Sequence, residues 1–491
     1  MQDTSSFDLL IRGGAIIDGT KRPRYRADVA VRGDRIVGIG DFSGHTATTE
    51  IDATGLVVAP GFIDSHTHDD QALLSQPDLP FKVSQGVTTV VTGNCGISVA
   101  PLRPGTALPA PLNLLDAGNE RFTSFGAYLD ALRARPAAVN VVPMVGHTNF
   151  RTIVMDDLER EATPEEVEAM KLLLEEALAA GAVGMSTGTY YPPAAAATEH
   201  EVTEVSRPLG ARRALYVTHI RNEADRCLES IEETFRIGHE VSTPVLLSHH
   251  KLMRAANFGK STLTLRRIEE EMQRRCVNLD CYPYTASSTM LHLDEERLQG
   301  RVTLASCGPH PEFVGRDLQD IADAWGVSRV EASKRLQPAS AIYYSMDEAD
   351  VQRILAFERT MIGSDGVPAG ERPHPRLWGT FPRVLGRYSR DIALFPLETA
   401  VWKMTGLTAE VFGLAQRGVI AEGCHADITL FDPATVQDLA DYDNPTTPAQ
   451  GIEAVIVNGA VAYRSGEHRH TRTGRVLSRT PPEAFAVAAG P

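Results

Sequence analysis

The sequence contains no uninterrupted apolar stretch of about 18 residues, the length that a membrane-spanning helix needs. Its start, MQDTSSFDLL, is polar and acidic, whereas a secretory signal peptide begins with basic residues followed by an apolar segment. The two absences argue against a membrane protein and against secretion. We therefore expect a cytoplasmic protein with no membrane partner.

Positive charge is also scarce. The chain has 48 Lys and Arg residues against 63 Asp and Glu residues, which gives a net charge of −15. Binding to nucleic acid requires a basic surface that neutralises phosphates, so we expect no nucleic-acid partner. A small anionic substrate needs only a local cationic pocket and remains compatible with this charge.

Cysteine is rare, with six residues among 491 and no CxxC pair. This number does not support a disulfide framework, and the spacing does not support a zinc ribbon. We expect all of the cysteines except Cys95 to be buried thiols without a chemical role.

Short apolar runs broken by Gly-Gly, Asp-Gly and Gly-Asp occur at both ends of the chain. They are FDLLIRGGAIIDGT and YRADVAVRGDRIVGIG near the start, and ADITLFDPATV and GIEAVIVNGAVAYRSG near the end. Such runs are typical of small antiparallel strands and tight turns. Because neither end offers enough strands for a core, we predict one small β-sandwich domain built from residues 1–60 and 415–480.

Between these ends, apolar runs alternate with helical segments. In TPEEVEAMKLLLEEALAAG, Thr163 and Glu166 form a capping box and Gly181 ends the helix. The candidate buried strands are LVVAPGFID, GVTTVVTG, VNVVPMVGH, AVGMSTG, ALYVTHIR, PVLLSHHK, VNLDCYPY and TMIGSD. Eight such units predict an α/β fold with a (β/α)8 TIM-like barrel over residues 61–414. The interval 285–342 is too long for one crossover, so we predict an inserted helical subdomain or lid there.

Polar side chains follow these runs at their carboxyl ends, which share one face in a parallel barrel. His66 and His68 in GFIDSHTHDD lie two residues apart, so on a strand they point to the same side. Two neutral imidazoles form half of a zinc site. Taken alone, the pair fits two hydrogen-bonded loop histidines equally well.

Further donors follow other strands. Cys95 lies in the Gly-rich turn VTGNCGIS, His219 ends the fifth run and Asp365 ends the eighth. Imidazole and thiolate ligands favour zinc over harder cations. Together with the HxH pair, these residues predict a site for one or two divalent ions.

The sixth run ends in SHHK, where His249 and His250 cannot both face inward on a regular strand. Alternation groups His249 with Lys251, and a lysine packed against helices would be unfavourable. We therefore assign His249 to the site and a structural role to His250.

These positions resemble the amidohydrolase superfamily: HxH after the first strand, His after the fifth and sixth, and Asp after the eighth, beside a split β-domain. The motifs GNCG, THIRNE, SHHK, GSDG and RPHPRLWGTFPRVLGRY are similar to the N-acyl-D-amino-acid deacylases, from about Asp8 to Arg475. The resemblance implies zinc-dependent hydrolysis of N-acyl-D-amino acids to a carboxylate and a free D-amino acid.

The resemblance also implies roles for single residues. Cys95, His219 and His249 would hold a tightly bound zinc, and His66, His68 and Asp365 a second, weaker metal position. A zinc-bound water with a pKa near 7 would attack the amide, and Asp365 would act as general base and then acid. A helix N-cap is the alternative role for Asp365.

For the substrate, the resemblance assigns the free α-carboxylate to Lys251, Tyr282 and Arg376. An Arg fork and a Lys point charge suit that group, although Arg376 in a surface ion pair is the alternative. Tyr191 and Ser288 match positions that line the family's pocket, rather than their neighbours Tyr190 and Ser287, and plain packing is the alternative for them.

Two other functions remain to be weighed. A hydantoinase-like cyclic-amide hydrolase would usually carry a lysine after strand four, and GAVGMSTGTYYPP has none. A non-catalytic scaffold would be expected to have lost ligands that this chain keeps. For the amino-acid side chain, the acidic run Asp294–Glu296 in MLHLDEERLQGR, with Arg297 as the nearest cation, favours neutral or broad specificity over D-Glu or D-Asp.

Overall fold

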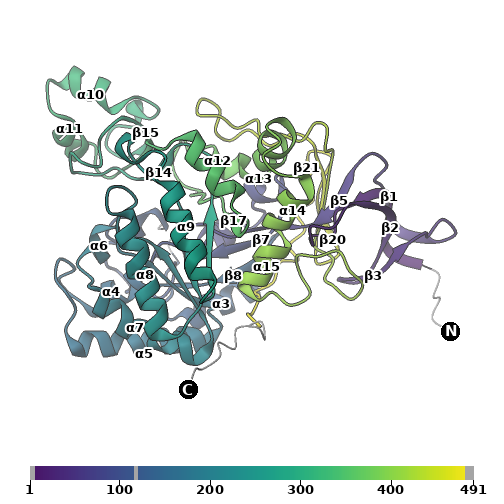
Figure 1. Ribbon diagram of the computed structural model, residues 1–491, viewed down its shortest axis with the longest axis horizontal. Coiled ribbons are helices and arrows are strands. Elements are labelled where there is room, and N and C mark those ends of the chain that lie inside the picture. Colours follow the sequence, from purple (N-terminus) through teal and green to yellow (C-terminus); the bar gives the residue numbers. More distant parts are fainter. Residues whose placement is uncertain (1–5, 116–119, 481–491) are drawn as a thin grey trace.

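The computed structural model describes residues 6–115 and 120–480, so residues 1–5 of the expected N-terminal β-segment lie outside it. Strands from both chain ends join in one nine-stranded sheet, seen at the right of Figure 1. Its members are β1 (Ser6–Ile16), β2 (Tyr25–Arg32), β3 (Arg35–Gly40), β4 (Thr46–Asp52), β5 (Val57–Pro60), β18 (Ile428–Phe431), β19 (Ile452–Val457), β20 (Ala460–Arg464) and β21 (Glu467–His468).

The expected sandwich of two sheets is not the hydrogen-bonding pattern found. Strand β5 pairs with β1 on one side and with β18 on the other, and so merges the two ends of the chain into a single sheet. Alternate apolar side chains of these strands, among them Ile11, Val29 and Ile428, share one buried cluster. The alternation read from the sequence therefore marks the inner face correctly, while the pairing depends on β5.

Parallel strands form two further sheets, so the chain has a mixed α/β fold. The three-stranded sheet contains β6 (Phe62–Asp64), β7 (Val87–Thr92) and β8 (Asn140–Pro143). The six-stranded sheet contains β9 (Val145–Gly146), β10 (Gly184–Gly188), β11 (Leu215–His219), β12 (Val245–Leu247), β13 (Val277–Cys281) and β17 (Thr360–Ile362). Just beyond β6 and β17 the two sheets meet, where Asp365 N donates to His66 O at 2.8 Å.

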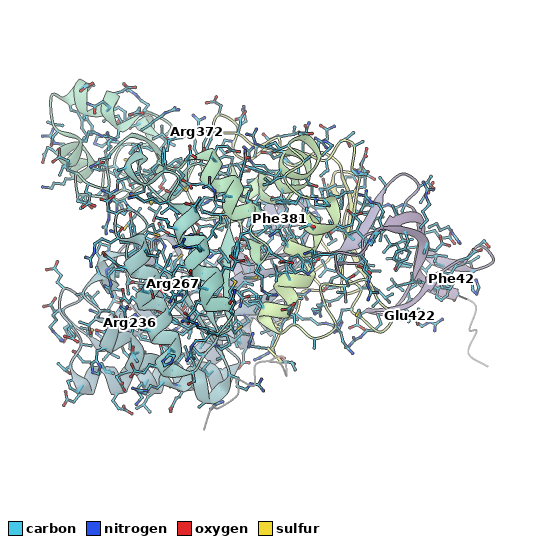
Figure 2. All side chains as sticks on the ribbon, viewed as in Figure 1. Phe42, Arg236, Arg267, Arg372, Phe381 and Glu422 are labelled. Carbon is cyan, nitrogen blue, oxygen red and sulfur yellow. The ribbon has the colours of Figure 1, made fainter. Side chains whose placement is uncertain are left out.

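The first predicted strand, LVVAPGFID, is divided between two sheets. Residues Val57–Pro60 are β5 of the nine-stranded sheet, and Phe62–Asp64 are β6 of a parallel sheet. Gly61 lies at the division, where a Cβ would come within 2.2 Å of the Thr88 side chain. After the division, the buried Phe62 ring stacks on that of Phe381, with the ring centroids 5.8 Å apart. Phe381 is labelled in Figure 2.

Helices connect most of the parallel strands and cover their outer side (Figure 1). The predicted helix is confirmed as α5 (Pro164–Ala180), with the Thr163–Glu166 capping box and Gly181 at its end. The other helices of this part are α1 (Ala72–Ser75), α2 (Pro80–Val83), α3 (Phe125–Ala134), α4 (His147–Val154), α6 (Pro192–Ala195), α7 (Glu199–Arg212), α8 (Cys227–Val241), α9 (Ser261–Met272), α12 (Glu348–Ala356), α13 (Arg376–Arg383), the π-helix η4 (Val384–Asp391), α14 (Leu397–Met404) and α15 (Gly406–Phe412).

The segment expected to be a helical insert also contains an antiparallel sheet. Its strands are β14 (Ser287–Met290), β15 (Arg301–Cys307) and β16 (Ala339–Tyr344), and its helices are α10 (Leu318–Trp325) and α11 (Arg329–Arg335), at the upper left of Figure 1. The helices pack on the sheet through residues such as Leu304, Ile321 and Leu336. The predicted helical subdomain is incomplete as a description, because the segment also contains strands and those of β15 and β16 pair with each other.

Along the described part of the chain, we find no helix that is both long enough and apolar enough to cross a membrane.

Candidate metal centre

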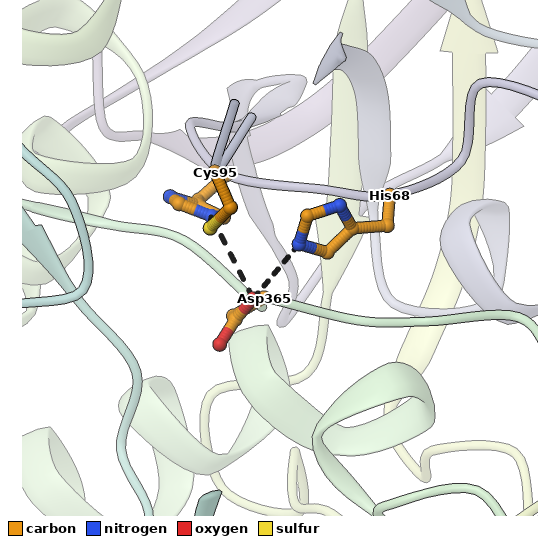
Figure 3. Close-up of side chains that lie close together, drawn as sticks. His68, Cys95 and Asp365 are labelled. Carbon is orange, nitrogen blue, oxygen red and sulfur yellow. Dashed lines mark hydrogen bonds and ion pairs between the residues drawn. The ribbon is translucent and has the colours of Figure 1, made fainter. Parts of the chain in front are cut away.

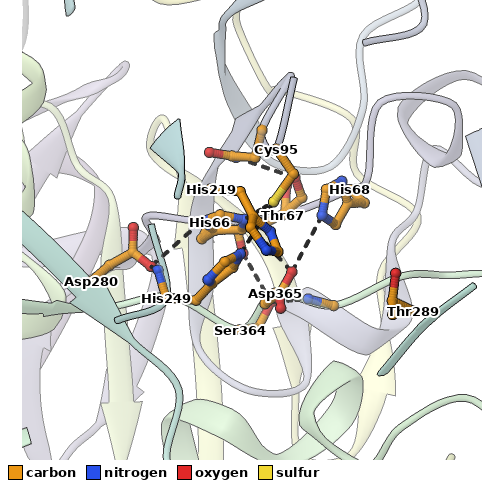
Figure 4. Close-up of polar contacts among 12 residues, drawn as sticks. His66, Thr67, His68, Cys95, His219, His249, Asp280, Thr289, Ser364 and Asp365 are labelled. Carbon is orange, nitrogen blue, oxygen red and sulfur yellow. Dashed lines mark hydrogen bonds and ion pairs between the residues drawn. The ribbon is translucent and has the colours of Figure 1, made fainter. Parts of the chain in front are cut away.

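The six residues predicted to bind metal converge at the carboxyl ends of the parallel strands (Figure 4). Potential ligand atoms of Cys95, His219 and His249 all lie within 4.8 Å of one another. The same limit joins Cys95 to His66, His68 and Asp365. The thiol of Cys95 therefore belongs to both groups, and all six side chains are buried.

Cys95 sits in a loop after β7 that only a few sequences can form. Its φ is +53°, and the nearby Gly93 and Gly96 both have φ of +76°. A Cβ on Gly93 would lie 1.9 Å from the carbonyl oxygen of Met144, so glycine is required there. This left-handed loop turns the thiol toward the imidazoles, with Sγ 3.2 Å from His66 Nε2 and 3.3 Å from His249 Nε2.

Ser186 fixes this loop from strand β10. It accepts a hydrogen bond from Gly96 N at 2.9 Å and donates one to Gly93 O at 2.5 Å. The segment GMSTG around Ser186 matches the GxSxG pattern of serine hydrolases, but it forms a buried strand and not a strand-to-helix turn. With its hydroxyl engaged by the backbone, Ser186 is placed as a support for Cys95 and not as a nucleophile.

The SHHK segment places its side chains as predicted, although by a different backbone geometry. Strand β12 ends at Leu247, and His249 has φ of +35°, so strand alternation does not apply there. Lys251 Nζ lies 2.7 Å from His249 Nδ1. His250 points away and contacts Thr264 Oγ1 at 2.9 Å, which agrees with the structural role assigned to it.

Glu223 is a buried carboxylate that the sequence analysis did not single out. Its oxygens lie 2.5 Å from Lys251 Nζ, 3.2 Å from His249 Nδ1 and 3.4 Å from His219 Nε2. Burial acts to raise the pKa of Glu223, but its contacts with His219, Lys251 and His249 lower it well below its usual range. The available signal was its position four residues after His219.

Asp280, at the end of β13, was also missed. Its Oδ1 accepts a hydrogen bond from His249 N at 2.7 Å and lies 3.5 Å from His66 Nδ1. Burial raises the pKa of Asp280 to about 7. Asp280 stands two residues before Tyr282, which the family resemblance had selected, and strand alternation from Tyr282 would have pointed to Asp280 as well.

Asp365 faces both HxH histidines. Its Oδ1 lies 3.3 Å from His68 Nε2 and 3.6 Å from His66 Nε2, and Figure 3 shows it beside His68 and Cys95. On its other side, Arg376 approaches Oδ2 at 2.8 Å. Burial alone would raise the pKa of Asp365, but Arg376 and the imidazoles lower it well below its usual range. Asp365 is thus an ionised carboxylate aimed at the metal ligands.

Arg376 is not part of a surface ion pair, because only 1% of the residue is exposed. Its guanidinium lies 4.6 Å from the centre of the Tyr282 ring and donates to Ser288 O at 3.0 Å. The same Tyr282 ring has Lys251 Nζ at 5.5 Å. Two cations and a phenol therefore border the candidate metal ligands.

Tyr190 and Tyr191 both contact the candidate metal ligands, whereas the sequence predicts this only for Tyr191. Both rings lie 4.9 Å from the His219 ring, Tyr190 stacked and Tyr191 edge-on. The family resemblance pointed to Tyr191 alone, whereas both side chains reach the cluster because the chain turns just after β10 ends at Gly188. Ser287 and Ser288 both line a small hollow beside this cluster.

This hollow lies directly over the cluster and is lined by His219, His249, Lys251, Ser288 and Asp365, among others. It adjoins a wider cavity of about 540 Å³ through shared walls. The shared lining residues are Tyr190, Glu223, Met253, Arg297 and Tyr343. The wider cavity thus lies next to the hollow over the cluster.

The donor set suits a zinc ion. Both ring nitrogens of His219 are buried without a hydrogen-bond partner, as is Nδ1 of His68. Burial lowers the pKa of His66 and of His249 to about 3, so these rings are neutral and offer lone pairs. Burial also raises the pKa of the Cys95 thiol well above its usual range, and a bound cation would reverse that by favouring the thiolate.

Known proteins resemble this chain over nearly its whole length. The amidohydrolase family profile matches residues 49–463. A D-aminoacylase from Alcaligenes xylosoxydans xylosoxydans is 58% identical over 479 residues, which cover 97% of this chain and 99% of the relative.

Two solved structures extend the likeness to three dimensions. The first is a structure of D-aminoacylase from work on its binuclear metal centre. Its TM-score is 0.95 and its identity 56%, and the match covers 96% of this chain and 100% of the D-aminoacylase chain. The other, an N-acyl-D-glutamate deacylase from Bordetella bronchiseptica complexed with zinc and a phosphonate inhibitor, has a TM-score of 0.93 and 46% identity, and covers 96% and 99%. The chain belongs to the amidohydrolase family, in the group of the N-acyl-D-amino-acid deacylases.

Proposed function

We propose that the protein hydrolyses N-acyl-D-amino acids to a carboxylate and a free D-amino acid in a zinc-dependent reaction. The observation that carries this proposal is the buried Cys95–His219–His249 group beside the ionised carboxylate of Asp365. The relatives named above act on N-acyl-D-amino acids, and one is complexed with zinc. The D-configuration of the substrate is taken from those relatives.

Cys95, His219 and His249 would hold the tightly bound zinc, and His66, His68 and Asp365 a second, weaker metal position. When bound, zinc lowers the pKa of a water ligand to about 7 and polarises a carbonyl group. Asp365 accepts the proton of the attacking water and passes it to the departing nitrogen. Arg376 and the imidazoles hold the pKa of Asp365 low, which keeps it in the ionised form that a proton acceptor requires.

Lys251, Tyr282 and Arg376 would bind the free α-carboxylate of the substrate, with Tyr191 and Ser288 lining the pocket. Arg376 and Lys251 already flank one Tyr282 ring, which places two positive charges next to the candidate metal ligands. These cations pair with Asp365 and Glu223. A substrate carboxylate would share them, which fixes the amide relative to the metal ligands.

The parallel strands β6 to β13 and β17 form, in our proposal, one closed TIM-like barrel over residues 61–414. Its supports are the parallel bridge between Thr67 and Gly366 and the bond from Ser65 N to Ile362 O. Of the predicted composite β-domain, 1–60 and 415–480, the described residues 6–60 and 415–480 form one unit, and 285–342 form the insert. Closure explains why ligands from five strand ends reach one point.

A panel of substrates tests the function and its alternatives. We expect the zinc-loaded protein to release free amino acid from N-acetyl-D-methionine, to leave N-acetyl-L-methionine intact and to leave hydantoin rings intact. Turnover of hydantoins without turnover of N-acetyl-D-amino acids would instead support a cyclic-amide hydrolase. An inactive protein with bound zinc would support a scaffold.

The charges that line the wide cavity predict which amino-acid side chain the substrate should carry. Its acidic walls are Glu223, Asp294, Glu295 and Glu296, and its cations are Arg254 and Arg297. Both cations are engaged: Arg254 lies 3.0 Å from Glu296, and Arg297 lies over the Tyr190 ring at 4.3 Å. A second substrate carboxylate would therefore meet excess negative charge.

We expect kcat/KM for N-acetyl-D-methionine to exceed that for N-acetyl-D-glutamate by about tenfold or more, which corresponds to about 1.4 kcal/mol of repulsion. The charge reversal Glu295→Arg should narrow this ratio, and the neutral change Gln299→Ala on the same wall should leave it unaltered. Equal rates for the two substrates in the unaltered protein would show that Arg297 turns to the substrate.

A further inference from the structure

Lys82, in the short helix α2, has its whole side chain buried. A buried ammonium group requires partners, because desolvation disfavours its charge. Its Nζ lies 2.7 Å from Asp64 Oδ2, 3.0 Å from Ser364 Oγ and 3.3 Å from Asp69 Oδ2. The function proposed above uses none of these four residues.

Two partners of Lys82 stand just before the segments that carry the second group of candidate ligands, His66, His68 and Asp365. Asp64 is the last residue of β6 and stands two residues before His66, and Ser364 stands directly before Asp365. The other oxygen of Asp64 accepts from Ser364 N at 2.8 Å and from His66 N at 3.3 Å. One ion pair thus fixes the backbone of both segments.

Ser364 extends this connection toward Asp365 (Figure 4). Its hydroxyl oxygen accepts from Lys82 Nζ and from Gly366 N at 3.1 Å, and its hydroxyl proton points to His66 O at 3.4 Å. Among the described residues, Lys82 is hydrogen bonded to no candidate ligand side chain. Its contacts reach the site through Asp64, Asp69, Ser364 and the backbone that carries them.

We infer that Lys82 is a positioning residue that holds the HxH segment and the Asp365 segment in register, and so sets the geometry of the second metal position. The inference rests on the proposed function for that metal position. Cys95, His219 and His249 follow β7, β11 and β12, which Lys82 does not contact through any hydrogen bond or ion pair of the described residues. The two metal positions should therefore respond differently when Lys82 is changed.

Metal titration of the full chain separates the two responses. In Lys82→Met we expect one equivalent of zinc to remain tightly bound and the affinity for the second to fall by 10- to 100-fold, as for other groups that orient metal ligands. We also expect kcat for the deacylation to fall while KM changes by less than about threefold, because Lys82 does not touch the substrate. Since the metal readout needs no turnover, it tests the inference even if the protein acts on another substrate.

Lys403 provides a matched control. It is also fully buried, and its Nζ donates to Glu358 O at 2.9 Å and to Thr360 O at 3.3 Å, at the opposite end of β17. Lys403→Met should lower the melting temperature without changing either metal affinity. If it weakens the second site as Lys82→Met does, the effect is general destabilisation and the inference fails.

A smaller change guards against a variant that does not fold. Ser364→Ala removes only the hydroxyl between Lys82 and the Asp365 segment, and we expect the second metal to bind about tenfold more weakly, with the first unchanged. Equal weakening of both metals, unchanged binding of both, or an unaltered protein that takes up only one zinc at saturation would overturn the inference.

Discussion

The variant Asp365→Ala is expected to lose deacylase turnover by about 10³-fold or more while it keeps one zinc per chain. The rate falls because the proton of the attacking water has no acceptor and the leaving nitrogen has no donor. The zinc remains because the Cys95, His219 and His249 group does not include Asp365. The measurement combines kcat with elemental analysis of the dialysed variant.

Asp365→Asn is the matched comparison, since it keeps the shape of the side chain but cannot accept the proton. It should be nearly as inactive as the alanine variant. Loss of the tight zinc in either variant would mean that Asp365 is chiefly a ligand of that ion. Near-normal turnover in the asparagine variant would mean that another group transfers the proton.

The variant Cys95→Ala is expected to lose both tightly bound zinc and activity, because the thiol belongs to both ligand groups. The loss of the metal removes several kcal/mol of transition-state stabilisation, on the order of 10³-fold or more in rate. Zinc content after dialysis and kcat/KM measure the two effects. Excess zinc should restore activity only in part, since two histidines still remain in the first group.

Cys281→Ala controls for the loss of a buried thiol. Cys281 ends β13 and is 3% exposed, and its Sγ contacts only the carbonyl of Tyr282 among the hydrogen bonds found in the described residues. This variant should bind zinc and turn over substrate like the unaltered protein. If Cys95→Ala also keeps its zinc, the shared ligand is misassigned.

The candidate ligands could be found from the sequence because each one stands where an apolar run ends. His219 is the last residue of a short strand, and His66, Cys95 and Asp365 come just after one. Parallel strands bring such ends together. That these ligands lie close together could be predicted without knowing the geometry of the loops. The exception was His249, which was chosen by strand alternation although the backbone has already left the strand at that residue.

The residues around the ligands were harder to find. Glu223 and Lys82 lie in segments that look solvent-exposed in sequence, and only the packed structure shows that each charge is buried beside an opposite one. Asp280 carried a usable signal in its alternation with Tyr282. A charged residue that supports a site is recognised by its burial beside an opposite charge, and a local sequence pattern does not reveal burial.

The β-sheets show a similar limit. The strands of the insert and the division of LVVAPGFID at Gly61 depend on pairing between distant segments, such as β5 with β18. Strand propensity marks which residues can pair but does not choose their partners. The capped helix Pro164–Ala180 was predictable because its start and end signals are local.

The most direct measurement of the central claim is an anomalous difference map from crystals of the zinc-loaded protein, recorded at the zinc absorption edge. The account predicts a strong peak about 2.3 Å from Cys95 Sγ and about 2.0–2.1 Å from one ring nitrogen each of His219 and His249. Density for zinc elsewhere, with this thiol and these rings bound to no ion, would contradict it.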